Sequence, residues 1–254
     1  MSDPGTWSDF FSQTAWLIFF AFFLEFAARR WHPDSRVFSS HLPAKSALAA
    51  LSSTIIGVGL IWLIFFSMSS PGDTSTGQVW NLSGVISQAI LAAIMLAPAM
   101  IAMYVNREGP GSVGFTTKNI GFALVIAGTL AVASFFEAGK GREWQLSFTV
   151  AQFWSFLHYA VVGFAEETLF RGYLQSRLEN WLGTVPGWLI ASLMMALAHI
   201  AQRMVMSDMV FVDALISSLK LISISLFFGY LYMRTRNILA PGIVHTFANW
   251  LGTL

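Results

Sequence analysis

Two adjacent glutamates stand inside an apolar stretch of the chain, "VVGFAEETLFRGYL" at residues 161–174. No Asp, Glu, Lys or Arg precedes them back to Glu143, and Arg171 follows four residues after Glu167. An ionisable side chain within a membrane span costs at least about 2.5–3.5 kcal/mol on insertion scales, so such a residue is a candidate functional group. The stretch therefore predicts a membrane helix that carries a polar site.

The composition of the whole chain is typical of an integral membrane protein. Of its 254 residues, 56% are hydrophobic and only 11% are Asp, Glu, Lys or Arg, whereas soluble domains carry about 25% charged residues. The formal net charge of +1, without a basic cluster, predicts no nucleic-acid partner. The chain has no cysteine, which excludes disulfides, thiolate metal ligands and a cysteine nucleophile.

Apolar stretches long enough to cross a bilayer recur along the chain. A spanning helix needs about 20 mostly apolar residues. The first stretch follows an acidic N-terminus, where a secretory signal peptide would be basic, so we expect it to be retained. We predict a single all-α domain over residues 1–254, a polytopic bundle of about eight transmembrane helices, with a motif-bearing core at about 140–254. The predicted spans are 10–28, 48–68, 85–105, 119–136, 147–176, 183–202, 209–233 and 237–253.

The Lys and Arg residues near the ends of these spans predict the orientation. Because Lys and Arg are enriched in cytoplasmic loops, we expect the side with ten of them to be cytoplasmic and the side with three to be external. Both chain termini would then lie outside, in a multi-pass protein of a bacterial or archaeal inner membrane. The first set is Arg29, Arg30, Arg36, Lys45, Arg107, Lys118, Arg171, Arg177, Arg234 and Arg236, and the second is Lys140, Arg142 and Arg203.

Glu166 and His199 are equally far from a turn signal. The Gly- and Pro-containing segment "WLGTVPG", residues 181–187, predicts a turn between two helices. In an antiparallel helix pair, residues equidistant from the turn lie at the same depth, here roughly 20–25 Å along each helix. We therefore expect the carboxylate of Glu166 and the imidazole of His199 to face one level of the membrane.

The last predicted span adds a histidine and an asparagine to that level. His245 follows Arg236 by nine residues, roughly 14 Å along a helix, and Asn249 lies one turn further on the same face. Glu167 and Arg171 have the i, i+4 spacing of an ion pair, which leaves Glu166 available as a general base. The alternative is a purely structural network, because polar side chains also hold membrane helices together.

Two other ionisable residues in the spans have simpler structural interpretations. Glu25 lies four residues before Arg29 and close to the expected membrane interface, which favours a surface ion pair. His158 lies two turns before Glu166 and fits a hydrogen-bonded core histidine.

At these residues the sequence resembles the CPBP intramembrane proteases, also called the Abi or CAAX protease family. "EETLFRG" at residues 166–172 is similar to the first motif of that family, Glu-Glu-x-x-x-Arg. "MALAH" at 195–199 is similar to the second, Phe-x-x-x-His, with Met195 in the place of the usual Phe, and "HTFAN" at 245–249 matches His-x-x-x-Asn. The Met195 departure is expected to affect a packing residue only.

The resemblance implies an all-helical bundle whose active site opens to the membrane and the cytosolic side. It implies that Glu166 and His199 activate a water molecule and that His245 and Asn249 stabilise an oxyanion, a role suited to fixed donors in a dry site. Glu167 and Arg171 would hold the site in shape.

The metal requirement stays open at this point. A metal-free glutamate mechanism is favoured, because asparagine is a poor zinc ligand and no His-Glu-x-x-His is present. Zinc or another divalent metal would instead use Glu166, His199 and His245, an acceptable catalytic set with a fourth position for water.

Three classes of function are compatible with these residues. The leading hypothesis is an intramembrane endopeptidase acting on a membrane-bound protein C-terminus, prenylated or not, or on a peptide precursor. The second is an ion- or proton-coupled transporter, although transporters commonly show two related halves and the polar residues here gather in the C-terminal half. The third is a non-catalytic immunity or scaffold protein of the membrane.

Overall fold

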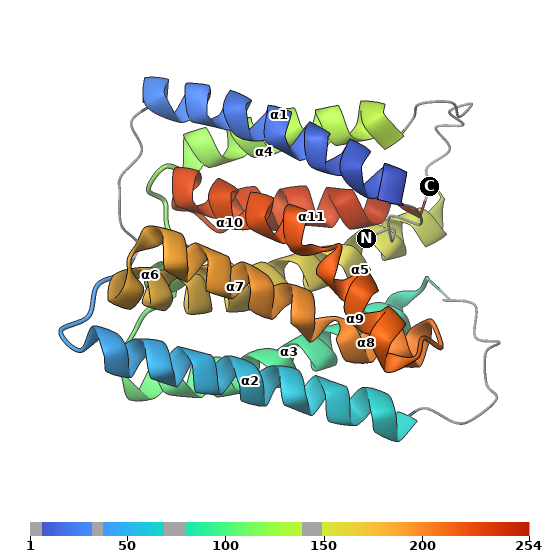
Figure 1. The fold of residues 1–254 in the computed structure, drawn as a ribbon, viewed down its shortest axis with the longest axis horizontal. Coiled ribbons are helices and arrows are strands. Elements are labelled where there is room, and N and C mark those ends of the chain that lie inside the picture. Colours follow the sequence, from blue (N-terminus) through green and yellow to red (C-terminus); the bar gives the residue numbers. More distant parts are fainter. Residues whose placement is uncertain (1–6, 32–37, 69–79, 139–148, 254) are drawn as a thin grey trace.

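The computed structural model describes residues 7–31, 38–68, 80–138 and 149–253, and these residues form helices and connecting turns without a strand (Figure 1). The all-α prediction is confirmed. The elements are α1 (Trp7–Trp31), α2 (Pro43–Met68), α3 (Leu82–Val105), the 3-10 helix η1 (Pro110–Val113), α4 (Ile120–Ala138), α5 (Val150–Glu167), the π-helix η2 (Thr168–Gln175), α6 (Ser176–Leu182), α7 (Thr184–Ala198), α8 (Ile200–Met206), α9 (Phe211–Leu219), α10 (Ile222–Thr235) and α11 (Leu239–Leu251).

Each predicted span has a helical counterpart, but three are not single α-helices. The fifth is divided into α5, η2 and α6, the sixth changes at His199, and the seventh changes at Lys220 and Leu221. π-Helical turns are rare and occur frequently at functional sites, and η2 begins directly after the two glutamates. The breaks lie at polar residues, such as Glu167 and Thr168 before η2, His199 and Lys220. A polar residue within an apolar stretch does not by itself predict a change of helix type, so the hydrophobic pattern did not predict these breaks.

Five helical segments are long and apolar enough to cross a membrane, which supports an integral membrane protein. They are Phe10–Trp31, Pro43–Ser67, Leu82–Val105, Thr184–Met206 and Phe211–Thr235, and Ile120–Phe136 is a shorter apolar helix. α5 and α11 are not among the five, although they carry most of the motif residues. The number of eight spans therefore stays a prediction.

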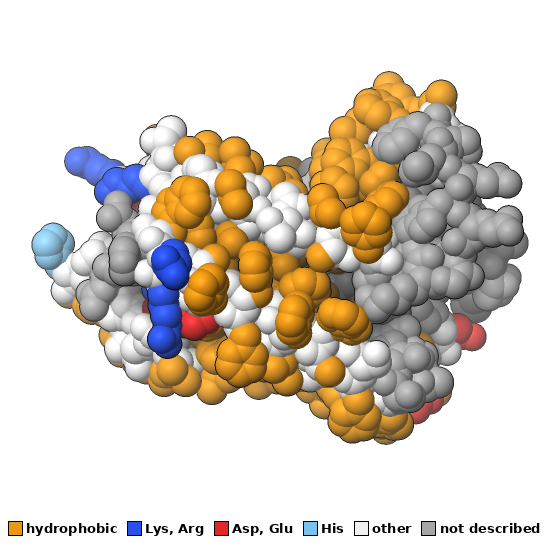
Figure 2. All heavy atoms as spheres, turned by 90° about the horizontal axis from the view of Figure 1, so that it is seen from above, with side chains coloured by type: hydrophobic (Ala, Val, Ile, Leu, Met, Phe, Trp, Pro, Cys, Tyr) orange, Lys and Arg blue, Asp and Glu red, His pale blue; other side chains and the backbone are white. Residues whose placement is uncertain are grey.

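The outer surface of the bundle is apolar in its middle. Figure 2 shows hydrophobic side chains along the midsection of one face and Lys and Arg side chains at one end. Phe22 in α1 and Leu63 in α2, for example, are 73% and 66% exposed. Contiguous exposed apolar surface of this kind marks contact with a membrane, which agrees with the predicted lipid bilayer as a partner.

The bundle places the motif helices between two outer helix pairs. In Figure 1, α1 and α4 lie along one side and α2 and α3 along the other, with α5, α7, α10 and α11 between them. α11 packs against α5 and α4, α3 packs against α5, and α7 packs against α10. Leu169, Phe170 and Leu174, which directly follow the glutamates, are at most 1% exposed and belong to the hydrophobic core.

The turn expected between residues 181 and 187 is present at Gly183. This residue has a φ of +92° and separates α6 from α7, so the chain reverses where glycine best tolerates the backbone conformation. The position lies at the midpoint between Glu166 and His199, and the two helices return side by side (Figure 1).

One end of the bundle carries most of the described Lys and Arg residues, and we call it the basic end. It comprises the end of α1, the start of α2 and the connections that follow α3, α6 and α10 (Figure 1). Arg171 was included among the ten Lys and Arg residues of the predicted cytoplasmic side, but it does not belong to the basic end, because its side chain is buried inside the bundle. Arg36, Lys140 and Arg142 lie outside the described residues. The orientation of the bundle in the membrane stays a prediction.

Candidate active site

Glu166, His199 and His245 converge from three different helices. The Oε2 atom of Glu166 lies 3.8 Å from the Nε2 atom of His199 and 3.9 Å from the Nε2 atom of His245. Glu166 stands near the end of α5, His199 at the junction of α7 and α8, and His245 in α11. The sequence prediction that these three groups share one level is confirmed.

Local sequence features bring α5 and α11 together at this level. α5 begins with a capping box in which the Thr149 side chain accepts from the Gln152 backbone and the Gln152 side chain accepts from the Thr149 backbone. A Cβ atom on Gly163 would lie 3.0 Å from the Thr246 hydroxyl and 3.1 Å from its backbone nitrogen. Glycine at 163 therefore permits a close approach of the two helices, one turn before Glu166 and beside His245.

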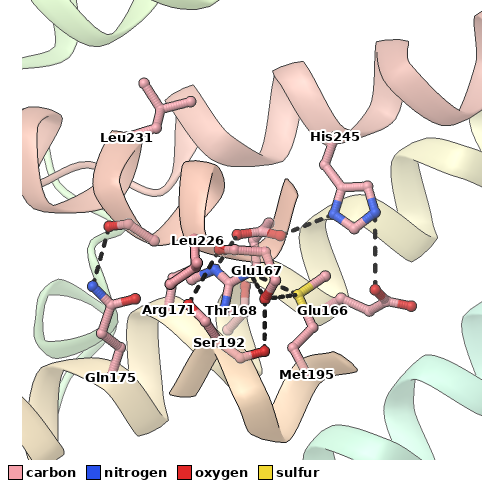
Figure 3. A network of polar contacts seen from close by, with 12 residues as sticks. Glu166, Glu167, Thr168, Arg171, Gln175, Ser192, Met195, Leu226, Leu231 and His245 are labelled. Carbon is pink, nitrogen blue, oxygen red and sulfur yellow. Dashed lines mark hydrogen bonds and ion pairs between the residues drawn. The ribbon is translucent and has the colours of Figure 1, made fainter. Parts of the chain in front are cut away.

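Glu167 is fully buried and uses its two oxygens on different partners (Figure 3). Its Oε2 lies 3.1 Å from Nε of Arg171, whose side chain is also 0% exposed, so the predicted ion pair is present. Its Oε1 lies 2.9 Å from Nδ1 of His245. This second contact was not predicted, because no spacing rule connects positions 78 residues apart.

The hydrogen bonds of the two histidines orient both rings toward Glu166. Nδ1 of His199 lies 2.8 Å from the Met195 carbonyl oxygen, which can only accept, so Nδ1 donates. In the neutral ring, Nε2 of His199 is then an acceptor. His245 likewise uses Nδ1 toward the Glu167 carboxylate and turns Nε2 toward Glu166.

Asn249 follows His245 by one turn of α11 and is 5% exposed. It lines the same cavity as Glu166, His199 and His245. Its Oδ1 atom has no hydrogen-bond partner among the described residues. All four predicted catalytic residues are thus assembled at one cavity, while Glu167 and Arg171 lie behind it.

The cavity has a volume of about 370 Å³ and a wall of mixed character. α2 and α3 supply mainly apolar side chains such as Trp62, Leu91 and Met95, together with the polar Gln88, and most of the other polar groups come from α5, α8, α11 and the junction residue His199. His158 also lines it and stacks edge-on against Trp80 and Tyr159. An apolar pocket with a few convergent polar groups is the usual form of a small-molecule or substrate site.

The cavity lies toward the end of the bundle opposite the basic end. Its α2 residues are at 58–65 and its α3 residues at 88–95, and Met206 and Ser207 at its margin are exposed. The α2 positions are in the half of the helix that points away from the basic end, and the α3 positions extend from that half to the middle of the helix (Figure 1). If the basic end is cytoplasmic, the cavity lies nearer the external side of the membrane. The orientation and an opening toward the cytosolic side both stay predictions.

The three groups do not fit a tetrahedral zinc ion as they lie. Ligand atoms at about 2.0–2.1 Å from zinc in a tetrahedron are about 3.3 Å from one another, whereas Glu166 Oε2 lies 3.8 and 3.9 Å from the two imidazole nitrogens. Within the described ranges, no group of three or more His, Asp and Glu side chains has an arrangement that could hold a metal ion.

Sequence reasoning missed the role of Met195 and did not consider Ser225. The Sδ atom of Met195 and the hydroxyl of Ser225 both accept hydrogen bonds from Nη2 of Arg171. Met195 is therefore more than a packing residue. Ser225 carried no signal in the sequence, because a single serine in an apolar span is ordinary.

Comparison with known families agrees with the motifs. Residues 147–251, less than half of the chain, match the family described as Type II CAAX prenyl endopeptidase Rce1-like. The match supports the CAAX protease-like family, which the three motifs had indicated, for the C-terminal part of the chain. Searches of the curated proteins and of the solved structures find no significant match.

Proposed function

We propose that this protein is an intramembrane endopeptidase that hydrolyses a peptide bond with a water molecule activated by Glu166 and His199, without a metal. The observation that carries the proposal is the convergence of Glu166, His199 and His245 at one cavity that Asn249 also lines. The family match of residues 147–251 supports a CAAX-type endopeptidase.

A water molecule fits the geometry between the carboxylate and the imidazoles. The 3.8 Å separation of Glu166 and His199 is too long for a direct hydrogen bond, and polar contacts beyond about 3.5 Å are commonly bridged by water. Both groups accept hydrogen bonds, so one water can donate a proton to each. The water oxygen is then held with a lone pair directed at the substrate.

The reaction then follows from the roles of these groups. The water oxygen attacks the carbonyl carbon while its proton passes to Glu166, and the carbonyl oxygen becomes an oxyanion. The side-chain amide of Asn249 donates to that oxyanion. When the C–N bond breaks, Glu166 returns the proton to the leaving amine, which is general acid catalysis by the same group.

His245 can assist the oxyanion only when its ring carries both protons. Its Nδ1 is directed at Glu167, so a donor at Nε2 requires the imidazolium form. The Glu167 carboxylate is placed to balance that charge, and Arg171 holds the carboxylate from the other side. Glu167 thus acts on the reaction through His245.

The substrate that best fits this cavity is a membrane-bound protein or peptide. Apart from Gln88, the wall formed by α2 and α3 is apolar, which suits a hydrophobic C-terminal segment or its lipid modification. A protein C-terminus, prenylated or unmodified, and a peptide precursor belong to this substrate class.

The test is cleavage of a candidate membrane peptide by the purified protein in detergent. Glu166→Gln is nearly isosteric, and we expect it to lower kcat by about 10²- to 10⁴-fold, the contribution of a general base, with no change in the unfolding temperature. Glu25→Gln is the matched control and should retain activity, because Glu25 contacts Arg29, Arg234 and Tyr230 and does not belong to the described cavity lining. Glu166→Gln activity within a fewfold of wild type would refute the proposal.

Further measurements on the same samples separate the alternatives. Cleavage that persists after dialysis against a chelator, with no metal found by elemental analysis, is expected for the metal-free mechanism. Loss of cleavage on chelation and its return with zinc would contradict it. A Glu166-dependent ion flux in liposomes without peptide cleavage would favour the transporter.

A further inference from the structure

The guanidinium of Arg171 is buried and is contacted from three helical elements. The side chains of Arg171 and Glu167 are both 0% exposed, and Nε of Arg171 lies 3.1 Å from Oε2 of Glu167. Nη2 of Arg171 donates to Sδ of Met195 (Figure 3) and to the Ser225 hydroxyl at 3.0 Å. Ser225 belongs to α10 and Met195 to α7.

Ser225 donates its hydroxyl proton to a neighbour on α7, either the Ser192 carbonyl oxygen or, at the longer distance of 3.4 Å, Sδ of Met195. The Ser225 hydroxyl lies 2.9 Å from the Ser192 carbonyl oxygen, and the Ser192 hydroxyl donates to the Ser225 carbonyl oxygen at 3.3 Å. A serine hydroxyl has one proton, so with that proton directed at Ser192 its oxygen accepts from Arg171. This pair of bonds ties α7 to α10 beside the guanidinium.

Met195 contacts both halves of the site. Its sulfur accepts from Arg171, and its backbone carbonyl accepts from Nδ1 of His199. The phenylalanine that is usual at this place in the motif has no sulfur and could not accept this hydrogen bond. Thioether sulfur is a weak, polarizable acceptor.

We infer that Met195 and Ser225 position Arg171, and through it Glu167 and His245, for the reaction proposed above, on which this inference rests. Glu167 divides its oxygens between Arg171 and His245. A guanidinium released from its two acceptors can rotate, the carboxylate follows it, and Nδ1 of His245 loses its partner. Misplacement of a catalytic group by about 1 Å can lower a rate by about 100-fold.

A positioning role differs from a packing role in what it changes. Met195, Ser225, Arg171 and Glu167 are all absent from the described lining of the cavity, so a substrate bound there does not touch them. Their loss should therefore lower kcat and leave KM nearly unchanged. It should also change the hydrogen bond at Nδ1 of His245, which is observable without any substrate.

The test uses Met195→Leu, which keeps the volume but removes the sulfur, and Ser225→Ala, which removes the hydroxyl. Met194→Leu, the same substitution at the neighbouring position of α7, is the control. We expect each test variant to lower kcat by about 10- to 100-fold with KM within twofold, while the control keeps the wild-type kcat. In protein with ¹⁵N-labelled histidine, the Nδ1 signal of His245 should shift in both test variants and not in the control.

Each other result would overturn the inference. Unchanged kcat in both test variants contradicts it, as does a lowered kcat with an unchanged His245 signal, because the effect would then not pass through Glu167. Failure of the proposed function can be told apart from failure of this inference. In the first case the wild-type protein would not cleave the peptide, or Glu166→Gln would still cleave it. The NMR comparison would still report on the positioning of His245.

Discussion

The chain contains two Glu–Arg pairs with the same i, i+4 spacing and opposite environments. Glu167 and Arg171 are both 0% exposed, whereas the side chain of Arg29, which pairs with Glu25, is 78% exposed. Breaking a buried ion pair by removing one partner costs about 3–5 kcal/mol, because the other charge stays buried. Exposed pairs contribute about 0–1 kcal/mol.

We therefore predict that Arg171→Met lowers the free energy of unfolding by about 3 kcal/mol, at the lower end of the range for buried pairs. The lower end applies because Nδ1 of His245, which lies 2.9 Å from Oε1 of Glu167 in the wild-type protein, leaves a second polar group near the displaced carboxylate. Arg29→Met should change it by less than about 0.5 kcal/mol. The assay is denaturant unfolding in detergent, followed by near-UV circular dichroism of the tryptophans.

The double variant Glu167→Leu with Arg171→Met tests whether removing the second charge raises or lowers the free energy of unfolding relative to Arg171→Met. Replacing both partners of a buried pair by apolar residues is often neutral or stabilising, so the double variant should be more stable than Arg171→Met alone. Equal losses for Arg171→Met and Arg29→Met, or a double variant less stable than the single one, would refute the reasoning.

Three further predictions concern the approach of two helices, the oxyanion and the orientation. Gly163→Leu should separate α5 from α11 and lower kcat by at least about tenfold. The control Gly128→Leu, where an added Cβ meets open space, should keep the wild-type kcat. Equal activities of the two variants would contradict the close approach of α5 and α11. Asn249→Ala should lower kcat by about 10²- to 10³-fold with unchanged unfolding, as expected for loss of an oxyanion donor, and a changed KM alone would argue against that role. Because the chain has no cysteine, Thr117→Cys and Ser207→Cys can each be labelled with an impermeant maleimide in oriented membranes. The orientation predicted from Lys and Arg requires that Ser207→Cys reacts from outside and Thr117→Cys from the cytoplasm, and the reverse pattern would place the cavity on the cytosolic side.

Much of the bundle follows from the sequence by simple physics. The length of each apolar stretch predicts a helix, because hydrogen bonds within a helix satisfy the backbone in lipid. Each of the eight stretches has a helical counterpart among the described residues. The turn at Gly183 and the depth of Glu166 and His199 follow from equal spacing on either side of a glycine. The pair Glu167–Arg171 follows from its i, i+4 spacing.

The contacts between distant segments could not be obtained in the same way. The bond between Glu167 and His245 and the acceptors of Arg171 on α7 and α10 depend on which helix faces which. Hydrophobic periodicity does not select a partner when nearly every face of a helix is apolar. The same limit explains why Met195 was expected to act by packing alone.

By itself, the sequence determined that this chain forms membrane helices and which acid, imidazole and amide groups they carry, because burying charge in lipid restricts where such residues can stand. Only the tertiary structure decided that Glu166 faces both histidines and that Glu167 lies behind them. It also placed the cavity away from the basic end. The physical reason is that position along a helix sets depth, whereas the direction of a side chain depends on how closely neighbouring helices pack.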